Sequence, residues 1–193
     1  LAAVLTGQAE LAAASKNISD RPAKLLYLEG IYSERVENYV HDGLIKIARA
    51  LPEHIDIRPA PKAEINKFLD SHKTIYDFEI CQNIGPLMQA HKQLMSIEIL
   101  EAIKRGKAIS QADYHAALLV RDEATDFFDS MLSGYEGLLS ASATGEAPIF
   151  EEGTGDSICN CLWSLTGYPS VSLPISGEYE ITGPNGLGVG IQL

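Results

Sequence analysis

The sequence has 193 residues, of which 46% are hydrophobic and 21% charged, and its formal net charge is −11 at pH 7. This composition is typical of a globular protein with one substantial core. The acidic balance argues against a nucleic-acid partner, because binding a phosphate backbone needs a clustered basic surface. No run of about eighteen apolar residues predicts a membrane span, and no basic-then-apolar signal opens the chain. Three cysteines do not make a disulfide framework, which favours a reduced, cytoplasmic setting.

The first sixty residues predict a helix followed by a strand-helix-strand unit. Leu1–Ala14 is rich in Ala and Leu and predicts a helix, and Ser15–Pro22 is a polar break. The apolar run Leu25–Leu28 predicts a buried strand. Apolar residues recur every three or four positions over Ser33–Leu51, which predicts a helix with one buried face. Ile55–Arg58 predicts a second strand, at the spacing of a βαβ unit whose strands pair in parallel.

The middle of the chain predicts mainly helix. Ala63–Ile84 and Leu87–Lys104 both carry patterns compatible with a helix, and Gly85-Pro86 separates them. Two long helices are therefore expected before the next break.

Two helix boundaries can be placed by their end residues. Gly106 follows a basic last turn, where it predicts a helix C-cap. Ser110 is a good N-cap, and Asp113 three residues later predicts a capping box. A further long helix should begin there.

From residue 136 onward, glycine and proline become frequent and short apolar runs follow one another. Leu138–Ala141, Val171–Leu173 and Val189–Gln192 predict three more strands. The fold class predicted is α/β, with a mixed β-sheet covered by helices. We expect a single domain built from three stretches: a strand-helix-strand unit at 1–60, a mainly helical part at 61–135, and a motif-bearing part at 136–193.

Two strings near the end of the sequence resemble the C-terminal region of the amidase signature family. They are GDSICNCLWSLTGYPSVSLP (155–174) and GLGVGIQL (186–193); the family runs Gly-Asp, Asn, Trp, then Gly-x-Pro, a strand ending in Pro and a last glycine-rich strand. Residues 106–121 are similar to the family's Gly…Ser-x-x-Asp-Tyr…Ala…Arg helix. Gly188 stands where the family usually has Pro, and LLSASATGE (138–146) replaces its Leu-Thr-Pro-Thr. The resemblance covers most of the chain and is specific from Gly106 onward.

The resemblance implies hydrolysis of a carboxamide C–N bond through an acyl-enzyme. In the family, a nucleophilic Ser is activated by a second Ser and by a neutral Lys, which lie in a Gly- and Ser-rich stretch of the N-terminal half. The sequence has no Gly-Ser-Ser-Gly-like stretch, and Ser140-Ala141-Ser142 lacks a flanking glycine pair. The chain also begins at Leu1 and stops at Leu193 inside an apolar run. We therefore expect a piece of an amidase with no catalytic residue of its own, inactive alone, whose partner is the missing N-terminal half of the same fold.

Three residues of the motif are candidates for one wall of the substrate pocket. They are Asp156, Asn160 and Trp163. Each also has a structural interpretation: Asp156 could cap a helix, Asn160 could anchor a loop, and Trp163 could be a core aromatic.

The same residues bear on other functions and ligands. The chain could instead be a non-catalytic subunit or binding fragment, or an amidotransferase A-type subunit that passes ammonia to a partner. No cofactor and no metal are expected: Cys159-x-Cys161 has no second ligand pair, and the glycines at 186–190 lack the helix and acidic residue of a dinucleotide site. The expected ligand is a small-molecule amide. A truncated sheet exposes apolar edges, so a homo-oligomer or a self-associating chain is expected.

Overall fold

The computed structural model describes residues 23–193, so the predicted helix and polar break before Pro22 lie outside the described residues. The predicted βαβ unit is confirmed. Strand β1 (Leu25–Glu29), helix α3 (Asn38–Ala50) and strand β2 (Ile55–Pro59) follow one another, and β1 and β2 pair in parallel. Helix α3 begins at Asn38, later than the apolar pattern predicted, because a turn comes first. In this turn the carbonyl of Tyr32 accepts hydrogen bonds from the backbone N–H groups of the third and fourth residues after it.

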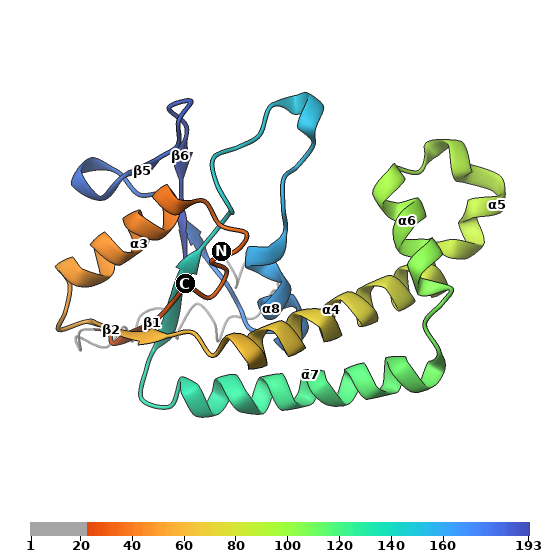
Figure 1. Cartoon of the computed structure of the whole chain (residues 1–193), viewed down its shortest axis with the longest axis horizontal. Helices are drawn as coiled ribbons and strands as arrows, with labels where there is room; N and C mark the ends of the chain where they lie inside the picture. Colours follow the sequence, from red (N-terminus) through yellow and green to blue (C-terminus); the bar gives the residue numbers. More distant parts are fainter. Residues whose placement is uncertain (1–22) are drawn as a thin grey trace, which may run out of the picture.

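Two long helices lie side by side below the sheet. Helix α4 (Lys62–Asn83) and helix α7 (Gln111–Met131) run antiparallel and extend well beyond the strands (Figure 1). The predicted capping box at the start of α7 is confirmed. The Ser110 hydroxyl accepts from the Asp113 N–H at 3.1 Å, and the Asp113 carboxylate accepts from the Ser110 N–H at 3.2 Å.

The single helix predicted at 87–104 is wrong. This segment forms a small lobe at the far end of α4, made of short helices η1 (Gly85–Leu87), α5 (Met88–His91) and η2 (Lys92–Leu94) before α6 (Ile97–Gly106). Ser96 is extended and caps α6, so the helix starts there. Leu94 is 78% exposed, so the early part of the segment has no buried face against which one continuous helix could pack.

The prediction of a C-cap at Gly106 is also wrong. Gly106 is the last residue of α6 itself and does not have a left-handed conformation. Its small size serves packing instead, because a Cβ atom there would lie 2.1 Å from the backbone oxygen of Asp77 in α4. The glycine lets the two helices touch through their backbones.

The C-terminal part completes a mixed sheet. The order of strands is β2-β1-β3-β7-β4, with β1 and β3 parallel and β7 antiparallel to both β3 and β4. The single strand predicted at Val189–Gln192 is wrong, because the chain changes sheet at Gly190: Val189 belongs to a separate small hairpin and Ile191 to the main sheet. The elements of this part are β3 (Gly137–Ala141), η3 (Phe150–Glu152), α8 (Ile158–Thr166), β4 (Ser172–Leu173), η4 (Gly177–Tyr179), β5 (Ile181–Thr182), β6 (Gly188–Val189) and β7 (Ile191–Gln192).

Helices cover the sheet on both sides, which gives the α/β fold that the sequence predicted. Figure 1 shows α3 on one side of the strands and α8, with the near ends of α4 and α7, on the other. An aromatic cluster joins the second layer: the Phe128 ring of α7 lies 6.2 Å from that of Phe68 in α4 and 5.4 Å from that of Trp163 in α8. Among residues 23–193, no helix has the length and apolar character needed to cross a membrane.

Candidate functional site

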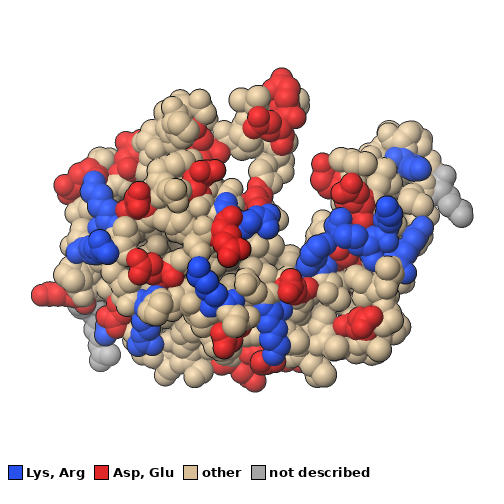
Figure 2. Space-filling view, viewed as in Figure 1, with Lys and Arg blue, Asp and Glu red and all other residues tan. Residues whose placement is uncertain are grey.

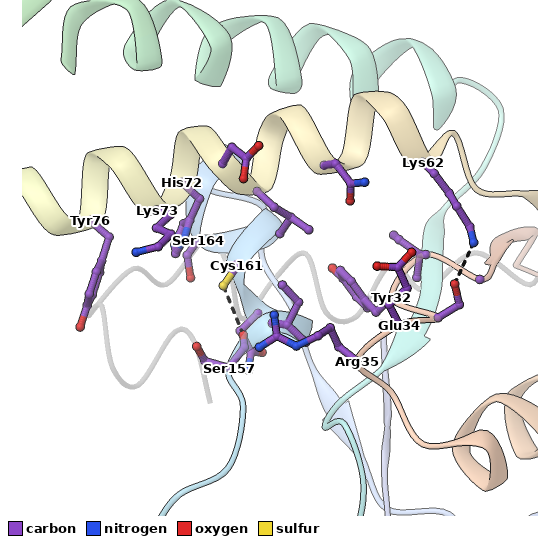
Figure 3. Close-up of a pocket in the computed structure, with 18 residues that line it drawn as sticks. Tyr32, Glu34, Arg35, Lys62, His72, Lys73, Tyr76, Ser157, Cys161 and Ser164 are labelled. Carbon is purple, nitrogen blue, oxygen red and sulfur yellow. Dashed lines mark hydrogen bonds between the residues drawn. The ribbon is translucent and has the colours of Figure 1, made fainter. Parts of the chain in front are cut away.

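A cavity of about 880 Å³ lies between three elements that are far apart in the sequence. Its walls are the loop after β1, the first half of α4 and the first turns of α8 (Figure 3). The space-filling view shows this part of the surface hollowed beneath the loop that leads to α8, with acidic and basic side chains interspersed around it (Figure 2). In open α/β sheets, ligands bind outside the carboxyl ends of parallel strands. The cavity occupies that position at the end of β1.

The loop after β1 turns sharply into the cavity wall. Gly30 has φ +78°, a left-handed conformation that glycine adopts without strain. The next residues, Ile31 and Tyr32, are buried against the core. Ser33 to Arg35 then face the cavity with polar side chains. The Tyr32 hydroxyl is buried without a hydrogen-bond partner among the described residues, and burial raises its pKa far above the usual value, so it stays protonated.

The cationic groups around the cavity are held by neighbours. Lys62 Nζ donates to Ser33 Oγ at 2.9 Å, which ties the start of α4 to the loop. Lys73 Nζ pairs with the buried Asp77 carboxylate at 2.8 Å. Arg35 forms an ion pair with Asp156 at the base of α8. These contacts fix the positions of the charges, and Lys62 is the lining cation that has no carboxylate partner among residues 23–193.

The imidazole of His72 contributes a neutral aromatic face to the α4 wall. It stacks on Tyr76 with ring centroids 6.2 Å apart, and burial lowers its pKa. The ring is therefore uncharged at neutral pH. Nearby apolar side chains, Ile31, Leu69 and Ile158, line the same cavity, so it combines an apolar surface with polar groups.

The first candidate from the sequence, Asp156, lies at the N-terminal end of α8 beside the cavity. Its Oδ1 accepts from the Ile158 N–H at 3.0 Å, which is the interaction with free helix N–H groups that its position suggested. Helix α8 itself begins two residues later, at Ile158. Its other oxygen, Oδ2, holds Arg35.

The second candidate, Asn160, lines the cavity directly. It is exposed on the first turn of α8, and Cys161 and Ser164 on the same helix line the cavity with it (Figure 3). Its Oδ1 accepts from Gln192 Nε2 of β7 at 2.9 Å. A side chain that faces the cavity is thus also bonded to the sheet.

The third candidate, Trp163, lies one helical turn after Asn160 on α8 and is buried in the core. It is 8% exposed, packs edge-on against Phe128, and does not line the cavity. Gly167 ends the helix with φ +74°, a left-handed conformation that is typical of a glycine at a helix C-terminus. Of the three candidates, Asn160 lines the cavity, Trp163 belongs to the core, and Asp156 lies just before α8.

The thiols near the cavity are poor nucleophiles. Burial raises the pKa of Cys159 to about 12 and also raises the pKa of Cys161, so both are protonated at neutral pH. Among residues 23–193 no group of three or more His, Cys, Asp or Glu side chains is placed to hold a metal ion.

Sequence reasoning missed the residues of the other two walls. Arg35 and Lys62 are isolated charges in the sequence, with no motif around them, and they reach the cavity only because the loop and α4 meet there. The sequence pattern places Gln192 in a strand and assigns it no partner. The signal that could have found one is its alternation: a polar residue between apolar Ile191 and Leu193 is expected to face away from them, toward another polar group.

The likeness of this chain to known proteins lies in its fold. No protein-family model matches the chain, and neither does any curated protein. Solved structures do match. One is an amidase, with TM-score 0.71 and 19% identity over 89% of this chain and 41% of the amidase. Another is a bacterial aryl acylamidase of the amidase signature enzymes, with TM-score 0.65 and 16% identity over 93% of this chain and 41% of that one.

A third similar structure is the A-type subunit of the glutamyl-tRNA(Gln) amidotransferase from Thermotoga maritima, with TM-score 0.60 and 19% identity over 88% of this chain and 38% of that one. The chain thus spans about two fifths of the length of the structures that it matches. It has the fold of the C-terminal part of the amidase signature enzymes, as the motif of residues 155–193 suggested.

Proposed function

We propose that this chain is the C-terminal portion of an amidase that hydrolyses a carboxamide C–N bond to a carboxylate and ammonia or an amine. The observation that carries the proposal is the fold shared with an amidase and an aryl acylamidase over nearly the whole chain, together with the matching motif at residues 155–193. The Ser-Ser-Lys machinery of an acyl-enzyme mechanism would come from polypeptide outside these 193 residues, because the sequence has no stretch that could carry it.

In this proposal, the cavity between the β1 loop, α4 and α8 is one wall of the substrate site. Asn160 faces the substrate, and Asp156 holds Arg35 at the rim. Trp163 anchors α8 in the core through its contact with Phe128. The protonated thiols of Cys159 and Cys161 would not compete as nucleophiles. The free thiols Cys81, Cys159 and Cys161 fit a reducing, cytoplasmic setting.

The partner proposed is the remaining half of the same fold. Strand β4 is an edge of the five-stranded sheet, and Val171 and Leu173 there are 57% and 38% exposed. An apolar edge strand favours pairing with a further strand. Where the partner is absent, the same edge would promote self-association of the chain.

The test measures ammonia release from acetamide and benzamide. The chain alone should release none, and the chain joined to polypeptide bearing the Ser-Ser-Lys set should release ammonia until the nucleophilic Ser is replaced by Ala. Release by residues 1–193 alone would contradict the proposal, as would an assembled protein that folds and hydrolyses neither amide.

The likeness to an A-type amidotransferase subunit supports a second candidate, a protein that passes ammonia to a partner. The two differ in where the ammonia goes. An amidase releases it to solvent without any other protein, whereas the amidotransferase component would show glutamine hydrolysis that rises when a partner and its acceptor are added.

A further inference from the structure

A chain of hydrogen bonds leads from the middle of the sheet to the cavity. Ser140 of β3 and Gln192 of β7 are opposite one another in the antiparallel pair, and they are 1% and 2% exposed. Ser140 Oγ donates to Gln192 Oε1 at 3.4 Å, and Gln192 Nε2 donates to Asn160 Oδ1 at 2.9 Å. Two buried polar side chains therefore end on an exposed amide that lines the cavity.

In the structure Gln192 donates and Asn160 accepts, which gives the two ends of the Asn160 amide different surroundings. A side-chain amide carries an acceptor at one end and two N–H donors at the other. Because Gln192 donates, Asn160 must turn its oxygen toward the sheet. Among residues 23–193 its Nδ2 makes no hydrogen bond, so Nδ2 is the end of the amide that is available to a ligand in the cavity that Asn160 lines.

The surroundings of Asn160 suit a ligand with a hydrogen-bond acceptor beside an apolar group. Ile158 and Ile31 line the same cavity and can contact an aryl or alkyl group. The adjacent thiol of Cys161 bonds to the Ser157 carbonyl and does not offer a competing donor to the cavity.

We propose that Asn160 donates a hydrogen bond to the carbonyl oxygen of an amide bound in this cavity, and that Gln192 is the positioning residue that turns the Asn160 amide the right way. The choice of an amide as ligand rests on the proposed function. The substrate class named is a carboxamide with an apolar substituent, held at its carbonyl oxygen.

Binding can be measured without catalysis, so the result does not depend on the amidase assay. The probe is N,N-dimethylbenzamide, a tertiary amide that has a carbonyl acceptor and no N–H donor of its own. It is titrated into the ¹⁵N-labelled chain, and the side-chain NH₂ signals of Asn160 are followed with the backbone signals of the cavity walls. We expect the Asn160 NH₂ signals to shift with the same dissociation constant as the walls.

The informative variant is Asn160→Asp. A carboxylate still accepts from Gln192 Nε2, so the fold contact is kept, but the donor toward the cavity is lost. We expect a melting temperature close to that of wild type and probe binding weakened at least about fivefold. Gln192→Met frees the amide to rotate, so only about half of the molecules present the donor and affinity falls about twofold.

Several results would overturn the inference. They are absence of probe binding to wild type at millimolar concentration, unchanged affinity in a stable Asn160→Asp variant, or unfolding of that variant, which would mean that the Asn160 amide donates to Gln192 instead. If the assembled enzyme bound the probe normally but released no ammonia, the proposed function would be contradicted and the inference about Asn160 would not.

Discussion

Replacing Gly106 with alanine tests how closely α6 packs on α4. The new methyl group would lie 2.1 Å from the Asp77 backbone oxygen and 2.5 Å from the Cys81 Cβ, whereas ordinary contacts begin at 3.4 Å. The nearest atom is backbone in the middle of a long helix, so it cannot swing away. The helices would have to separate by more than an ångström.

Two opposing effects decide the magnitude. Alanine favours a helix over glycine by about 1 kcal/mol, but overpacking costs about 1–3 kcal/mol and more where backbone must move. Separation would also pull Arg105 from Asp77, whose ion pair measures 2.7 Å. We expect Gly106→Ala to lower the free energy of unfolding by about 2–3 kcal/mol.

The assay is urea unfolding of the chain, followed by circular dichroism at the helix minimum. Gly188→Ala is the matched control, because nothing lies within 4 Å of its Cβ position and its φ is not positive; it should change stability by less than about 0.5 kcal/mol. If Gly106→Ala were as stable as wild type or more stable, the close backbone contact between α4 and α6 would be refuted.

Two further predictions concern carboxylates that hold elements together. Burial alone would raise the pKa of Asp77, but hydrogen bonds from Arg105 and Lys73 outweigh it and hold the pKa below its ordinary value. The ionised carboxylate therefore stabilises the folded chain at neutral pH, and this stabilisation is lost as the pH falls through the lowered pKa. Asp77→Asn should therefore cost about 2 kcal/mol at pH 7 and flatten the acid limb of a stability–pH curve, and an unchanged limb would contradict this. Glu146 accepts from the N–H groups of Asn185 and Leu187 at 2.9 and 3.1 Å. Glu146→Ala should therefore speed amide hydrogen exchange at those two positions about tenfold or more. Equal exchange rates in the variant and in wild type would show that the Glu146 contacts do not stabilise the hairpin turn.

The sequence predicted those elements of the fold that local rules decide. The strands Leu25–Leu28 and Ile55–Arg58 have apolar runs of strand length and are confirmed as β1 and β2. The capping box at Ser110 is also confirmed, because it depends on residues within a few positions of one another.

The failures at residues 87–106 and at the cavity depend on what a segment packs against. The pattern at 87–104 is helical in period, but Leu87 and Leu94 in its first half are exposed, and among the described residues no element buries them. The sequence assigns Gly106 to a helix end because the contact that requires a glycine, with Asp77, is far away in the chain. The cavity could not be predicted for the same reason, since Arg35 and Lys62 meet α8 only in the folded chain.

For Asp156 and Asn160, a structural contact does not exclude a place at the cavity. Asp156 uses Oδ1 to cap α8 and Oδ2 to hold Arg35 at the cavity. Asn160 uses Oδ1 to accept from Gln192 of the sheet, and its Nδ2 makes no hydrogen bond among residues 23–193. Each of these side chains has two polar ends, and a contact within the fold at one end sets the orientation of the other. A substitution that keeps the fold contact and changes only the second end, as Asn160→Asp does, can therefore separate stability from recognition, whereas truncation to alanine removes both at once.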